Sequence, residues 1–97
     1  METQRGAPEY AQDWKKAVNE GVRIGIMIAV RSEIVEGRFQ NPEEVESFRQ
    51  RAYGLFDNTE ARRIYGQRRA TELRGLVDEG IAQGLNPDIS IPDLDNN

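Results

Sequence analysis

A helix-ending glycine and a helix-starting Asn-Pro pair lie close together near the middle of this chain. Gly37 fits the position just past a helix, where a left-handed backbone is common. Asn41 is a strong N-cap, Pro42 fits the first helical turn, and Glu44 completes a capping-box-like spacing. The pattern predicts one helix that ends near Glu36 and a second helix that begins at residue 42.

The segment 9–36 carries no proline and has a recurring apolar face. Trp14, Val18 and Val22 stand four residues apart, as one face of a helix requires, and the simplest interpretation of this face is core. The stretch Val22–Ile26 also alternates apolar and polar or small residues, which is the period of a strand. A helix is favoured over 9–36, and a short strand at 22–26 is the alternative.

The rest of the chain predicts two further helices and a tail. Asp57 and Glu60 fit the start of a third helix, and Gly84, Asn86 and Pro87 fit its end. We therefore expect an all-α protein of about three helices, near 9–36, 42–56 and 58–84, with a disordered segment 1–8, a single helical domain over 9–85 and an extended acidic tail over 86–97. The predicted core positions are Val18, Val22, Ile28, Val45, Phe48, Ala52, Phe56 and Leu73.

The residue types present argue against an enzyme. The 97 residues include no histidine and no cysteine, which removes the usual general base, the commonest metal ligand and all thiol chemistry. The acidic residues of 43–46 are interpreted as the start of a helix, where the dipole favours anions, and not as a metal cluster. Asp88, Asp93 and Asp95 lack the loop pattern of a calcium site. We expect no catalytic residue, no cofactor and no metal.

Charge and hydropathy limit the compartment and the partners. The longest apolar run, 24–30, is far too short to span a bilayer, so the sequence predicts a cytoplasmic protein without a membrane contact. The net charge of −4 argues against generic binding to nucleic acid. A group of arginines at 62, 63, 68 and 69 has two interpretations: a solvated helix face paired with Glu60 and Glu72, or an anion-binding strip flanked by Tyr65.

Two segments together resemble the ParD family of antitoxins. The first is the joint at 36–45, where Gly37, Arg38 and Phe39 precede the capping Asn41 and a Glu-Val pair. The second is the segment 73–84, in which an acidic pair is followed by glycine, an apolar residue and a second small residue before the final Gly84. The similarity covers roughly residues 27–94.

The resemblance implies a ribbon-helix-helix-like dimer that neutralises a partner toxin. Family members begin close to a DNA-binding strand, whereas about twenty residues precede the only candidate strand here, Val22–Ile26. This departure weighs against DNA binding and leaves toxin neutralisation, which the family assigns to the last helix and tail, here 58–94. An acidic chain fits the neutralisation of a basic toxin.

The third helix and the tail supply the predicted partner-binding residues. They form a narrow apolar stripe with charged neighbours, and interior glycines weaken the helix when it is alone. We also expect a homo-oligomer, since 22–30 is apolar on more than one face. The predicted partner-binding residues are Arg69, Leu73, Arg74, Leu76, Val77, Asp78, Ile81, Asp88, Ile89 and Ile91.

Two other classes of function fit the same sequence. One is a small acidic inhibitor from a virus or a mobile element, of the anti-defence kind, that blocks a nucleic-acid-binding surface. The other is a small structural or virion assembly subunit, in which the Gly21 and Gly25 face packs on a second copy. The identity of the neighbouring genes would discriminate among the three.

Overall fold

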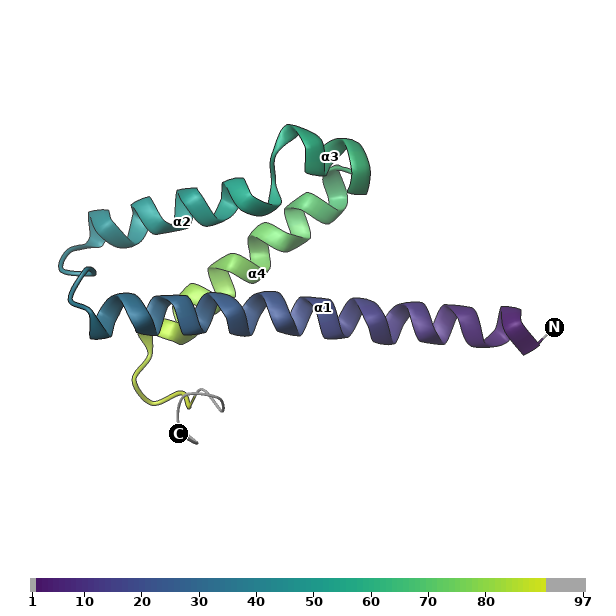
Figure 1. Ribbon diagram of the computed structural model, residues 1–97, viewed down its shortest axis with the longest axis horizontal. Helices are drawn as coiled ribbons and strands as arrows, with labels where there is room; N and C mark the ends of the chain where they lie inside the picture. Colours follow the sequence, from purple (N-terminus) through teal and green to yellow (C-terminus); the bar gives the residue numbers. More distant parts are fainter. Residues whose placement is uncertain (1, 91–97) are drawn as a thin grey trace.

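The computed structural model describes residues 2–90, and it describes side chains from Gln12 onward. The all-α prediction is confirmed for these residues, which form four helices and no strand. Helix α1 spans Glu2–Val35, α2 spans Pro42–Phe56, α3 spans Thr59–Tyr65 and α4 spans Gln67–Leu85. Figure 1 shows α1 as a long rod, with α2 returning above it and α4 running diagonally back from α3 toward the C-terminal part of α1.

The helices α1 and α4 form the main packing contact, and two glycines permit it. A Cβ atom built at Gly80 would lie 2.7 Å from the backbone oxygen of Arg23 and 2.8 Å from the Cβ of Ile26. A Cβ atom built at Gly84 would lie 2.8 Å from the Cβ of Val30. These separations are too short for any side chain larger than hydrogen, so the two glycines bring the backbones of α1 and α4 together.

The core is thin because the molecule is flat. Its Cα atoms extend 55 × 35 × 16 Å, a depth of about two packed helices. Of the predicted core positions only Ala52 and Leu73 are buried, and the other six are half-buried. The buried apolar residues that the sequence analysis did not include in the core list are Ile26, Met27, Val30, Ala61, Ala70, Val77 and Ile81.

The joint between α1 and α2 is as the sequence predicts. Gly37 has a φ of +74°, the left-handed conformation that favours glycine. The Asn41 side chain accepts a hydrogen bond of 3.0 Å from the backbone N–H of Glu44, and Pro42 occupies the first position of α2. The Glu44 carboxylate in turn accepts the backbone N–H of Gln40 at 3.1 Å, one residue before the position of a standard capping box. The N-cap at Asn41 is confirmed.

The prediction of one helix over 58–84 is wrong, because the chain breaks at Gly66. This glycine has φ +89° and ψ +158°, a conformation that residues with a side chain rarely adopt, and it separates α3 from α4. Asn58 caps α3 by accepting a 2.8 Å hydrogen bond from the N–H of Ala61, the role expected of Asp57. The predicted end of the helix is right, since α4 ends at Leu85 before Asn86.

The first helix differs from its prediction at its start and agrees with it in its middle. It begins at Glu2, so it takes in residues 2–8, for which the sequence predicted disorder. Several of these residues are strong helix formers, and Pro8 does not end the helix. The stretch Val22–Ile26, for which a strand was the alternative, is helical, and its Arg23 and Ile26 pack against Gly80 of α4. The ribbon of a ribbon-helix-helix fold is therefore absent between residues 2 and 90.

Candidate functional site

The predicted partner-binding stripe of α4 is largely used inside the molecule. Val77 and Ile81 have no exposed surface, and Leu73 is buried as well. Val77 and Ile81 belong to the core cluster that includes Ile26 and Val30 of α1. Val77 and Ile81 are unavailable to a partner while α4 packs on α1, and of the predicted apolar residues of α4 only Leu76 is partly exposed.

The charged residues predicted to orient the partner also have contacts within the chain. The Arg74 guanidinium lies 4.2 Å from the centre of the Tyr53 ring and 3.5 Å from a carboxylate oxygen of Asp57. Asp78 accepts hydrogen bonds from Arg49, at 2.5 Å, and from the hydroxyl of Tyr53. The hydrogen bond to Asp78 raises the pKa of Tyr53. These groups join α2 to α4.

Hydrogen bonds hold the end of α4 and the beginning of the tail against α1, which the sequence did not predict. Arg31 donates hydrogen bonds to the backbone oxygens of Gly84 and Asn86, both at 2.6 Å, and of Ile89, at 2.5 Å. Ile89 is half-buried and Asp88 is exposed. Of the predicted partner-binding residues, Ile91 lies outside the described residues.

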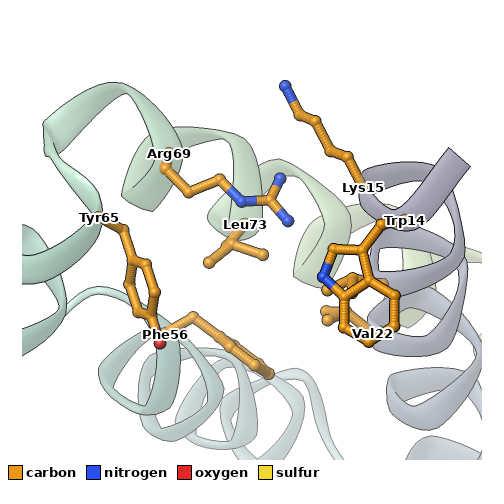
Figure 2. A pocket seen from close by; sticks show the side chains of 8 residues that line it. Trp14, Lys15, Val22, Phe56, Tyr65, Arg69 and Leu73 are labelled. Carbon is orange, nitrogen blue, oxygen red and sulfur yellow. The ribbon is translucent and has the colours of Figure 1, made fainter. Parts of the chain in front are cut away.

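The candidate site is an open groove of about 470 Å³ between the middle of α1 and the other three helices. We call it the Trp14 groove. Its wall on α1 is apolar, its floor and far wall come from α2, α3 and α4, and two basic side chains stand at its rim, as Figure 2 shows. The lining residues are Trp14, Lys15, Val18, Val22, Phe56, Tyr65, Arg69 and Leu73.

The aromatic rings of the groove are exposed without a partner. Trp14 is 63% exposed and Tyr65 is 62% exposed, although both face the same hollow as the half-buried Phe56. Large aromatic side chains bring much apolar surface and favour sites that exclude water from one side. The prediction that Trp14 is core is therefore wrong. The four-residue spacing of Trp14, Val18 and Val22 located an apolar face correctly, but nothing in the described chain covers it.

A network of charges forms the basic rim of the Trp14 groove. The Nζ of Lys15 on α1 lies 3.3 Å from one oxygen of Glu72, and the Nη1 of Arg69 lies 3.3 Å from the other. The Lys15 ammonium, assisted by Arg69, lowers the pKa of Glu72. Two cations share one carboxylate here, so the rim keeps a net positive charge in a chain whose net charge is −4.

The arginine group of α3 and α4 is mostly paired. Arg62 donates hydrogen bonds to Asp57, Arg63 pairs with Glu60, and Arg69 pairs with Glu72. This arrangement matches the interpretation of these arginines as a solvated face with local acidic partners. The hydrogen bond from Arg62 lowers the pKa of Asp57, which fits a carboxylate held in its charged form.

Two other kinds of site are absent from the described residues. Residues 12–90, whose side chains the structure describes, contain no group of three or more acidic side chains placed to hold a metal ion. In the same part of the chain, no helix combines the length and the apolar character needed to cross a membrane.

The comparisons with known proteins give no relative. The chain matches no known protein family, no curated protein and no solved structure.

Proposed function

We propose that this chain is a non-enzymatic protein-binding module whose partner inserts apolar side chains into the Trp14 groove. The observation that carries the proposal is the pair of exposed rings, Trp14 and Tyr65, on opposite walls of one hollow. Tryptophan, tyrosine and arginine are the residue types that dominate binding energy at protein interfaces. The groove places Arg69 beside both rings, so a single partner segment would contact all three residue types.

The residues that surround the rings support a protein partner. Val18, Val22 and Phe56 are half-buried, so they form a fixed apolar surface on which a partner can pack. Lys15 and Arg69 give the rim a positive charge that favours acidic side chains in the partner. The absence of histidine and cysteine from the sequence supports the non-enzymatic part of the proposal.

The resemblance to ParD-like antitoxins gives the proposal its most specific form, neutralisation of a partner toxin. In that form the contact surface differs from the stripe that the sequence suggested. Leu73 keeps a place at the floor of the Trp14 groove, and Arg69 keeps a place at its rim. Val77 and Ile81 serve the contact with α1 instead. The proposed partner surface is thus shared between the middle of α1 and residues 56–73.

Co-precipitation with the product of the neighbouring gene tests the proposal. The test variant is Trp14→Asp with Tyr65→Asp, which places two charges in the groove. The matched control is Val35→Asp with Leu55→Asp, which changes two residues that are 84% and 72% exposed and line no part of the Trp14 groove.

We expect the groove variant to lose the partner and the control to keep it, with helix content unchanged in both by circular dichroism. The loss should be more than about a hundredfold in affinity, since charged groups then occupy a desolvated contact. Full binding by the groove variant, or equal loss in both variants, would overturn the proposal.

A further inference from the structure

The Trp14 groove is open to solvent, and the chain itself contains a segment of matching chemistry. Residues 91–95 read Ile-Pro-Asp-Leu-Asp, so two aliphatic side chains three residues apart accompany two carboxylates. In the polyproline II conformation, which has about three residues per turn, such a segment places Ile91 and Leu94 on one face with the carboxylates beside it. It can then fill apolar hollows with its aliphatic side chains and pair its carboxylates with cations at the rim. The groove offers both an apolar lining and the cations of Lys15 and Arg69.

The position of the tail decides which copy of the groove it can reach. Arg31 fixes the backbone of Ile89 beside α1, and Val18, at the centre of the groove, precedes Arg31 by 13 residues. That separation is about 20 Å along the helix and roughly 140° around it. Leu94 is five residues beyond Ile89, a reach of about 17 Å at full extension. The tail is therefore too short to place Leu94 in the groove of its own chain.

Figure 1 agrees with this distance argument. The described part of the chain after α4 leaves α1 on the side opposite to α2 and α3, whereas the groove lies on the side of those helices. A contact between the tail and the groove must therefore join two copies of the chain.

We infer that the Trp14 groove binds the C-terminal tail, residues 91–95, of a second copy of this chain. The inference rests on the proposed function and names a partner for the same groove. Ile91 and Leu94 pack on Trp14 and the apolar wall, and Asp93 and Asp95 face Lys15 and Arg69. Such a contact joins two different surfaces of the chain. Two copies that exchange tails close a twofold dimer, whereas copies that pass the tail onward form a ring or a longer assembly.

Trp14 makes the contact directly measurable, because it is the single tryptophan of the chain. Tail binding should cover a ring that is 63% exposed and shift its fluorescence to shorter wavelength. The full-length protein is diluted over a wide concentration range, and its mass by light scattering and its Trp14 emission are recorded together. We expect both signals to change with the same midpoint.

A tail variant identifies the segment responsible. Ile91→Asp with Leu94→Asp should weaken association more than about tenfold, because two aliphatic side chains are then no longer buried from water when the copies associate. A synthetic peptide of residues 88–97 should shift the Trp14 emission of this variant and lower the mass of wild-type assemblies. The same peptide with both substitutions should do neither.

Charge reversal provides the control for direct contact. Asp93→Arg with Asp95→Arg, and separately Arg69→Glu, should each weaken association, and mixing the two variants should restore it. The restored complex requires the tail of one variant to meet the groove of the other.

Three outcomes would overturn the inference: a wild-type chain that stays monomeric up to roughly 1 mM, association that leaves Trp14 emission unchanged, or a tail variant that associates like the wild type. None of these outcomes contradicts the proposed function, which fails if the groove variant still binds the product of the neighbouring gene or if the groove variant and its control lose that binding equally. Conversely, the chain can associate through its tail while the variant Trp14→Asp with Tyr65→Asp still binds that gene product. This result would retain the inference and reject the toxin-like partner.

Discussion

Two glycines of α4 should differ in their response to the same substitution. Gly75→Ala and Gly80→Ala both replace an interior helical glycine by alanine in one helix. At Gly75 the new Cβ has no neighbouring atom within 4 Å, apart from the backbone of its own helix turn and its chain neighbours. At Gly80 it would lie 2.7 Å from the Arg23 oxygen and 2.9 Å from the Cγ2 of Ile26.

The magnitudes follow from these distances. Replacing glycine by alanine in a helix interior stabilises by about 0.5–1 kcal/mol, and this gain is common to both positions. At Gly80 the atoms in contact are a backbone oxygen and a β-branched side chain, which cannot rotate away. Overpacking of this kind costs about 1–3 kcal/mol, so Gly80→Ala should be less stable than Gly75→Ala by about that amount.

Thermal melting followed by circular dichroism measures the difference. For a domain of this size 1 kcal/mol corresponds to a shift of about 4–8 °C in Tm. Gly75→Ala should therefore melt about 2–8 °C above the wild type, and Gly80→Ala should melt below Gly75→Ala. Equal melting temperatures for the two variants would refute the reasoning, because they would mean that α1 and α4 do not approach each other at Gly80.

Three further predictions concern the cap, the core and an ion pair. Asn41→Ala should destabilise by about 0.5–2 kcal/mol, because the N–H of Glu44 loses its acceptor; an unchanged urea midpoint would contradict this role. Ile81→Ala should cost about 2–5 kcal/mol in urea unfolding, since Ile81 has no exposed surface; the matched Ile64→Ala, at a side chain that is 57% exposed, should change stability by less than about 0.5 kcal/mol. The hydrogen bond from Arg62 lowers the pKa of Asp57 in the folded state. The Asp57 carboxylate therefore stabilises the fold above its unfolded pKa of about 3.9, and this stabilisation is lost as pH falls through the folded-state pKa. The Tm advantage of the wild type over Asp57→Asn should therefore shrink below about pH 4, and an advantage that is independent of pH would reject this account.

The sequence predicted the features that depend on neighbouring residues. The joint at Gly37 and Asn41 is local, because a left-handed glycine and a side-chain cap act within four residues. The end of α4 is predictable for the same reason. The helix break at Gly66 was not predicted, because strong helix formers occur on both sides of this glycine and an isolated glycine is tolerated within helices.

The features that depend on distant residues were beyond the reach of sequence patterns. Periodicity located the apolar face of α4, but it does not say whether α1 or another protein covers that face. In the structure Val77 and Ile81 pack on α1, so the apolar stripe predicted to bind a partner is mainly core. Trp14 shows the opposite case, since its apolar spacing predicted core and its ring lies 63% exposed at a groove.

The close approach of α1 and α4 also explains where the Trp14 groove lies. The two helices are nearest where Gly80 and Gly84 meet residues 23–30, and Figure 1 shows them diverging from that point toward α3. Two straight helices that cross at an angle separate steadily away from the crossing, and the space between them must be filled by other side chains. Here Phe56 and Tyr65 fill it only partly, so Trp14 is left without cover. The glycines that close the core at one end of α4 therefore fix the angle that leaves the groove open at the other end. A substitution that pushes the crossing apart, such as Gly84→Ala, should then change the emission of Trp14 as well as the melting temperature, whereas Gly75→Ala should change the melting temperature alone.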